Sequence, residues 1–170
     1  MQSFKLPFCL SMASALAAGH AGAVTKFRLF SANAASYCQT ALPVFDGYVR
    51  KRPLSVSNEA RSGDAFVTCA FAAQAIPVDY VLIYLSNNGD AAASVSCTAV
   101  TGRNTGNNEY VTWTVPVPTS GQAFVAWTGA NFAGSPDTIP GNGLFSVSCK
   151  LPPGTGIDES FISFFEDVGA

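Results

Sequence analysis

Histidine and charged residues are both scarce in this sequence. Of its 170 residues only one is histidine, His20, and charged residues make up 12% of the chain. His20 lies in the N-terminal segment that we interpret below as a leader, so a mature chain would lack histidine. That loss excludes Ser-His-Asp and Cys-His mechanisms and histidine-based metal sites. The net charge of −2 argues against nucleic acid as a partner.

Several patterns that would indicate a cofactor or an α-helical architecture are also missing. The sequence contains no Gly-x-x-x-x-Gly-Lys-Ser/Thr phosphate loop and no Cys-x-x-Cys pair. Long runs with helical periodicity are absent, which disfavours alternating strands and helices. We therefore expect no cofactor and no metal. Asn87, Asn88 and Asp90 do cluster oxygen atoms, but a calcium site needs more carboxylates, and a turn explains them.

The N-terminal segment has the order of a secretory signal. Lys5 precedes a short apolar run over residues 6–18, and Ala21 and Ala23 then form an A-x-A site. The run is shorter than the roughly 20 residues that span a bilayer, which argues against a stable membrane anchor. We expect residues 1–23 to be a signal peptide cleaved after Ala23. Residues 24–170 would then form one domain, secreted or periplasmic.

Four cysteines remain after that cleavage, namely Cys38, Cys69, Cys97 and Cys149. An even number in an exported chain, without metal-site spacing, indicates two disulfides. Three pairings are open. We favour Cys38–Cys69 with Cys97–Cys149, because the latter two cysteines end the near-identical segments Ser-Val-Ser-Cys at 94–97 and 146–149.

Short apolar and β-branched runs separated by Gly, Asn, Pro and Asp predict many short strands. Residues 78–86 are apolar at nearly every position and predict a central strand covered on both faces. The Asn88-Gly89 step predicts a hairpin leading to a strand over 93–101. Further strands are predicted at 44–58 (one or two, broken at Pro53), 65–72, 110–115, 122–127, 144–150 and 160–165, although the last also fits a helical stripe. The basic triplet 50–52 fits a strand edge. The fold class is thus an all-β, antiparallel two-sheet β-sandwich, Ig-like or of jelly-roll type.

Two long loops are predicted, at 102–108 and 129–143, where binding residues commonly gather. Alternation places Trp113 on the apolar face of its strand, so we expect it in the core. Trp127 is the better candidate for an exposed ring. The predicted binding surface combines Trp127 with loop residues Asn131, Asp137 and Arg103.

Catalysis is the less favoured interpretation. Paired carboxylates such as Glu59 and Glu109 would be needed for a glycoside hydrolase-like activity, but both flank turns, where acidic residues are common. We therefore assign no catalytic residue. The residues favour a non-catalytic binding or structural domain whose partner is an extracytoplasmic protein or a glycan. An adhesin or envelope surface subunit, a carbohydrate-binding module and a small enzyme inhibitor remain as alternatives.

The spaced cysteines and the segment Ser148-Cys149-Lys150-Leu151-Pro152-Pro153-Gly154 resemble those of small secreted bacterial proteins of unassigned function. This resemblance implies export but no active residues. The prolines and Gly154 predict a rigid turn that delivers the last strand to a sheet.

Overall fold

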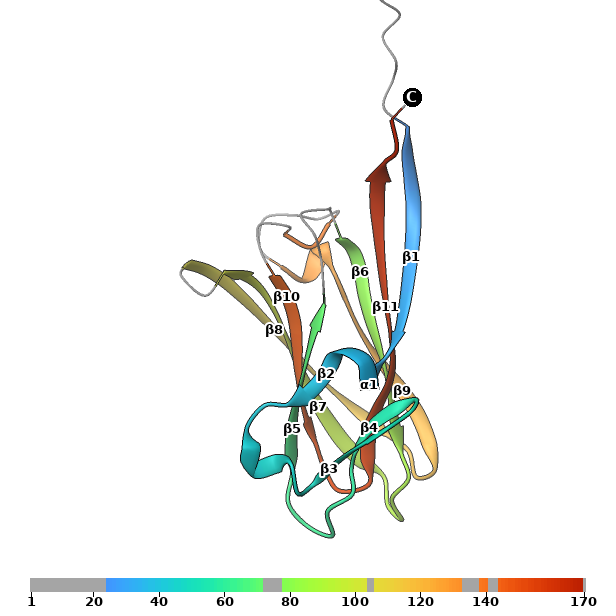
Figure 1. Cartoon of the computed structure of the whole chain (residues 1–170), viewed down its shortest axis with the longest axis vertical. Coiled ribbons are helices and arrows are strands. Elements are labelled where there is room, and N and C mark those ends of the chain that lie inside the picture. The colour runs from blue at the N-terminus through green and yellow to red at the C-terminus, as the bar shows by residue number, and fades with distance from the viewer. Residues whose placement is uncertain (1–23, 72–77, 104–105, 133–137, 141–143, 170) are drawn as a thin grey trace, which may run out of the picture.

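A computed structural model describes residues 24–71, 78–103, 106–132, 138–140 and 144–169 of the chain. Most of these residues form β-strands in two antiparallel sheets that pack face to face (Figure 1). The described residues include one four-residue helix, α1 (Ala34–Tyr37), and two 3-10 turns, η1 (Pro43–Phe45) and η2 (Gly129–Asn131). The predicted all-β, two-sheet sandwich is therefore confirmed. In these ranges no helix is long and apolar enough to cross a membrane.

The first sheet has β11 at its centre. Its strand order is β3 (Val49–Arg52), β4 (Ser55–Asn58), β11 (Thr155–Asp167), β6 (Val78–Asn87) and β9 (Gly121–Thr128). A sixth strand, β1 (Thr25–Asn33), pairs with the second half of β11. Since β6 occupies one side of β11, β4 and β1 follow one another along its other side.

The second sheet has β10 at its centre. Its order is β2 (Cys38–Thr40), β5 (Ala65–Phe71), β10 (Leu144–Leu151), β7 (Ala93–Arg103) and β8 (Gly106–Val117). Alternate residues face the core, so Val95, Cys97 and Ala99 of β7 and Val147 and Cys149 of β10 are all buried. The strands predicted over 93–101 and 144–150 are confirmed.

Both disulfides are confirmed, and both lie within the second sheet. Cys38 is bonded to Cys69 and Cys97 to Cys149. Each pair consists of directly opposed residues on neighbouring strands, β2 with β5 and β7 with β10. The disulfides therefore fix the register of one sheet and do not join the two sheets.

The predicted hairpin after β6 is wrong, because β6 and β7 belong to different sheets. The side chain of Asn87, which is buried, holds this crossing. Its amide nitrogen donates to Ala91 O at 2.8 Å and to Val117 O at 3.2 Å, and its amide oxygen accepts from Gly89 N at 2.8 Å. The outer face of β6 is half-buried, because the other sheet covers only the inner face.

The remaining strand predictions are largely correct. Pro53 does separate two strands, β3 and β4, although residues 43–45 form η1 instead of a strand. The basic triplet lies on β3, the last strand of its sheet. The predicted loop 102–108 is wrong, because β7 ends at Arg103 and β8 begins at Gly106. Of the loop 129–143, residues 133–137 and 141–143 lie outside the described residues.

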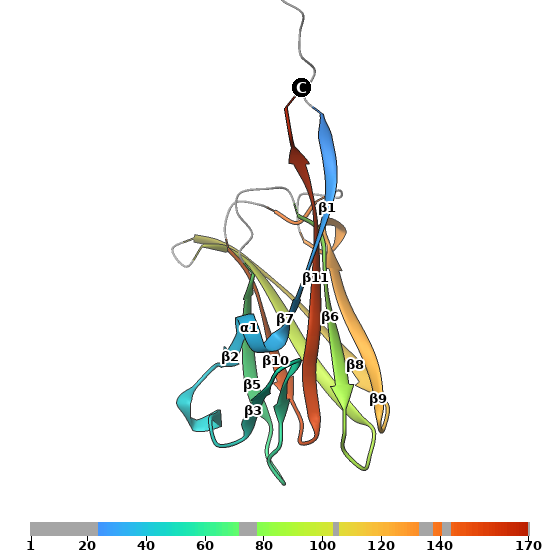
Figure 2. The same cartoon turned by 45° about the vertical axis from the view of Figure 1, so that its right-hand side comes forward.

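The pair formed by β1 and the end of β11 projects beyond the rest of the sandwich, as Figure 2 shows. The strand predicted at 160–165 is confirmed as part of β11. β6 pairs with β11 only as far as Phe164, whereas β1 follows β11 to Asp167. We call β1 together with residues 160–167 the ribbon.

Candidate ligand-binding surface

The predicted exposure of the two tryptophans is reversed in the structure. Trp127 is 0% exposed, and its indole nitrogen donates to Val111 O at 3.1 Å. Trp113 is 43% exposed although it lies on the inward face, opposite buried Cys97. The reason is position within the sheet: β8 is the last strand of its sheet, so its inward face is only partly covered.

Of the other predicted surface residues, Asn131 follows β9 of the first sheet, whereas Arg103 ends β7 of the second. The Asn131 side chain is used locally, since its Oδ1 accepts a hydrogen bond from Thr128 N at 2.7 Å. Arg103 is exposed at the end of β7, on the other sheet. Asp137 lies outside the described residues. With Trp127 buried, the structure gives no support to this combination of residues.

A different polar cluster lies on the outer face of the first sheet. The register between β11 and β6 shifts after Ile157, and Asp158 and Glu159 stand at this irregularity. Asp158 accepts a hydrogen bond from Ser86 Oγ at 2.8 Å and another from Gln122 Nε2 at 3.3 Å. Ser86 and Gln122 are directly opposed on β6 and β9. The carboxylate is thus oriented by two donors while lone pairs remain for a ligand.

Three aromatic rings continue this face from the polar cluster. Tyr84 and Phe124 are opposed on β6 and β9, two residues along each strand from Ser86 and Gln122. The ring centroids of Tyr84 and Phe124 are 6.3 Å apart, and those of Tyr84 and Phe161 are 5.8 Å apart. Phe124 is 58% exposed. Because residues two apart on a strand share a face, rings and polar cluster form one surface. We call these three rings the aromatic patch.

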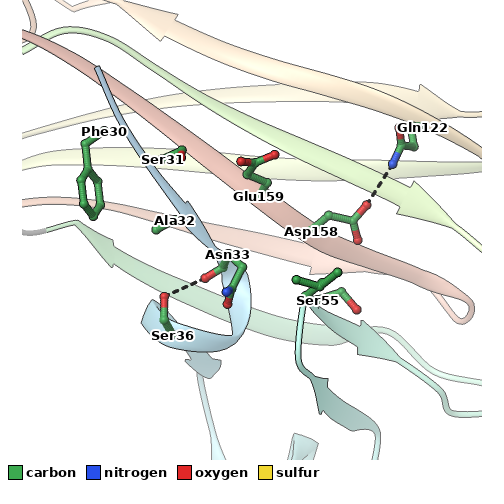
Figure 3. A pocket seen from close by; sticks show the side chains of 10 residues that line it. Phe30, Ser31, Ala32, Asn33, Ser36, Ser55, Gln122, Asp158 and Glu159 are labelled. Carbon is green, nitrogen blue, oxygen red and sulfur yellow. Dashed lines mark hydrogen bonds between the residues drawn. The ribbon is translucent and has the colours of Figure 1, made fainter. Parts of the chain in front are cut away.

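A depression of about 790 Å³ lies where β11 changes partner from β4 to β1. Figure 3 shows the hydrogen bond between Gln122 and Asp158 among the residues that line it. Asn33, Ser36, Ser55 and Glu159 add further polar groups to its lining, and exposed Leu54 adds apolar surface. A second depression of about 470 Å³ shares Gln122 and Asp158. Asp158 therefore stands between two adjoining hollows.

A half-buried tyrosine, Tyr37, lies close to the acidic residues of this region. The Tyr37 hydroxyl is buried and has no hydrogen-bond partner within the described ranges. Burial raises the pKa of Tyr37 to about 12; the Ser160 hydroxyl opposes this rise and the Glu159 carboxylate adds to it. Tyr37 is therefore neutral at physiological pH and packs against Phe71, with ring centroids 5.1 Å apart.

The carboxylates considered for catalysis do not meet. Glu59 forms an ion pair with Arg52 on the first sheet, whereas Glu109 belongs to β8 of the second. Within the part of the chain that the structure describes, no three His, Cys, Asp or Glu residues group as metal ligands would. The carboxylates that do line a depression, Asp158 and Glu159, were not singled out as candidates in the sequence. The sequence signal that could have identified them is two consecutive acidic residues within a strand. Consecutive strand residues point to opposite faces, and a strand of a sandwich is not expected to carry charge on both faces.

Comparison with known proteins yields similarity only at the level of solved structures. No family model matches the sequence, and no curated protein matches it. The family 11 carbohydrate-binding module of Clostridium thermocellum, solved with a β-1,3-1,4-mixed-linked tetrasaccharide, has a TM-score of 0.41 and 9% identity over 80% of this chain and 87% of that chain. The C-terminal family 6 module of a marine laminarinase from Zobellia galactanivorans has a TM-score of 0.46 and 14% identity over 79% and 98%. With TM-scores below 0.5, these similarities establish neither family nor ligand.

Proposed function

We propose that the protein is a non-catalytic binding domain that holds a glycan against the outer face of its first sheet. The observation that carries this proposal is the aromatic patch beside the oriented carboxylate of Asp158. A sugar ring has apolar C–H faces and a rim of hydroxyl groups. Flat apolar rings suit the former, and fixed polar groups suit the latter.

The arrangement of the carboxylates supports binding without turnover. Hydrolysis of a glycosidic bond requires two carboxyl groups that flank the bond, about 5 to 10 Å apart. Asp158 and Glu159 instead follow one another on β11, and Asp158 is engaged by two donors. A carboxylate held in this way can accept hydrogen bonds from the hydroxyl groups of a ligand. The depressions are shallow and open, as expected for a surface that a chain can lie across.

We further propose that the protein works outside the cytoplasm, with its leader removed after Ala23. The two disulfides support this location, because such bonds persist in oxidising compartments and are rare in the cytosol. Polysaccharides of envelopes and extracellular matrices would be accessible there.

Replacement of Phe124 by alanine tests the proposed surface. We expect Phe124→Ala to weaken glycan binding about five- to thirtyfold, because loss of one stacked ring removes about 1 to 2 kcal/mol. An array of soluble oligosaccharides would identify a binder, and titration calorimetry with that oligosaccharide would then compare variants. Folding should be retained, since Phe124 is largely exposed.

Tyr110→Ala provides the matched control. Tyr110 is also a strongly exposed aromatic residue on a strand, at 64%, but it lies on the second sheet. Binding by this variant should equal that of the unaltered chain. The proposal fails if no array member binds, or if the two variants lose affinity equally.

A further inference from the structure

The free side of β1 is the least protected strand edge in the described structure. β1 keeps one continuous register with β11 over nine residues, without a bulge, and contains no proline. Long, regular and apolar edges of this kind are templates for pairing with another strand. The other edges differ: β3 carries three cations in its four residues, and β2 has only three residues.

The two remaining end strands, β8 and β9, pack against each other. Trp127 of β9 donates to the backbone oxygen of Val111 on β8, which links these strands across the sandwich. β8 also contains Pro116, which has no N–H to donate. β1 has neither device.

Backbone geometry shows which residues of β1 face the free side. Val168 N donates to Val24 O at 3.0 Å, and residues 24 and 168 continue the register of the strand pair. In an antiparallel pair, hydrogen-bonded residues alternate with residues whose polar groups point away. Even-numbered residues of β1 therefore bond to β11, and odd-numbered residues, including Phe27 and Leu29, direct their N–H and C=O groups outward.

Three large apolar side chains of β1 are exposed where a partner strand would cover them. Phe27 and Leu29 are each 54% exposed and Phe30 is 60% exposed. Of the two cations of the strand, Arg28 forms an ion pair with Glu166, with Nε and Oε2 2.8 Å apart, and Lys26 is directly opposite Glu166 in the register. An added strand would bury these three side chains from the side.

We propose that β1 pairs with β1 of a second copy of this chain, antiparallel and centred on Leu29. In this register each Leu29 faces its symmetry mate, Arg28 lies opposite Phe30, and no cation faces a cation. Moving the register by two residues one way sets Arg28 opposite Arg28, which is repulsive. Moving it the other way leaves the first two residues of β1 unpaired. Of these three registers, the one centred on Leu29 therefore pairs β1 over its full length without placing two cations opposite each other.

The protein surface next to β1 leaves room for the partner strand. Antiparallel pairing brings the tip of the second β1 to Asn33, where β1 ends. There the depression lined by Asn33, Leu54 and Ser55 lies next to the strand. The contact is the same patch on both copies, so the assembly closes as a twofold dimer and does not grow into a fibre.

Sedimentation velocity on the purified chain between about 1 and 100 μM tests this pairing. We expect a dimer whose dissociation constant rises at least tenfold in Leu29→Pro, because proline removes an outward N–H without removing a bond to β11. Circular dichroism would verify that this variant folds. A monomer at every concentration, or an unaltered dimer in a folded Leu29→Pro variant, overturns the proposal.

A cross-linking variant keeps the test decisive if Leu29→Pro does not fold. Opposed Cα atoms in a hydrogen-bonded antiparallel pair are about 5.5 Å apart, within the range that a disulfide spans. Leu29→Cys should therefore form a covalent dimer under mild oxidation, seen on a non-reducing gel. Val44→Cys, at an equally open position in η1, is the control. Equal cross-linking of the two variants contradicts the pairing.

Discussion

At the scale of single residues, two buried asparagines connect the sheets. Asn58 at the end of β4 donates to Leu151 O of β10 at 2.8 Å and to Gly63 O at 3.0 Å, and its oxygen accepts from Ala60 N. Asn87 at the end of β6 makes the equivalent set, including a bond to Val117 O of β8. Each amide thus joins a strand end of the first sheet to a strand end of the second. Because the two N–H groups and the oxygen of each side-chain amide all form hydrogen bonds, burial of these two asparagines is stabilising.

Tyr37 gives the stability of the protein a dependence on alkaline pH. Its pKa is about 12 in the folded chain and about 10 when unfolded. Stability is therefore fully present below pH 10 and falls as the pH rises toward 12, because only the unfolded chain ionises readily there. The loss from this group is at most about 3 kcal/mol.

Urea unfolding between pH 8 and pH 11.5 would measure this loss in the unaltered chain and in Tyr37→Phe. The variant should lose less stability over that range and should be at least as stable at pH 8, since the hydroxyl it lacks has no partner. Tyr110→Phe, at an exposed position, should follow the unaltered chain. Parallel curves for Tyr37→Phe and the unaltered chain would contradict the assignment.

At the scale of elements, the disulfides and the strand faces were predictable from local pattern. Cys97 and Cys149, which end the two repeated Ser-Val-Ser-Cys segments, are directly opposed in register, as we predicted from this repetition. Alternation also gave the correct face for Trp113. It could not give exposure, because exposure depends on whether a strand lies at the centre or the end of its sheet, and that order is set by distant partners. Trp127 also lies on the end strand of its sheet, and it is buried because its ring packs beneath β8 of the other sheet.

Removal of one disulfide should destabilise the chain without changing the fold. We expect the double substitution Cys97→Ala and Cys149→Ala to lower the free energy of unfolding by about 2 to 4 kcal/mol, because the bond closes a chain segment with a sequence separation of 52. Urea titration, monitored by tryptophan fluorescence, would measure this loss in the free energy of unfolding. The pair Cys38→Ala and Cys69→Ala, with a separation of 31, should cost a similar amount. Unchanged midpoints in both variants would show that neither bond constrains the unfolded chain.

At the scale of the whole molecule, two surfaces are left for partners. The aromatic patch and Asp158 lie on the face of the first sheet, whereas the free side of β1 is an edge. Neither was found from sequence. Tyr84, Phe124 and Phe161 are far apart in the chain, and only the pairing of β6 with β9 and β11 brings them together. The connection from β6 to β7 likewise crosses between sheets, with the buried Asn87 amide bonded to Ala91 O and Val117 O, and this burial cannot be read from the turn residues alone.

The maturation of the molecule can be tested at Val24, the first residue that the structure describes. Val24 N donates to Gly169 O at 3.2 Å, so cleavage after Ala23 would leave the strand pair intact, with the new amine still a donor. Expression of the full sequence in an export-competent bacterium should yield a protein that begins at Val24, as measured by intact mass. Ala23→Phe should block processing, because the cleavage site requires small residues at positions 21 and 23. Gly22→Phe, at the intervening position, should be processed normally. A chain that keeps its leader in the unaltered sequence, or that carries four free thiols after export, would remove the basis for an extracytoplasmic role.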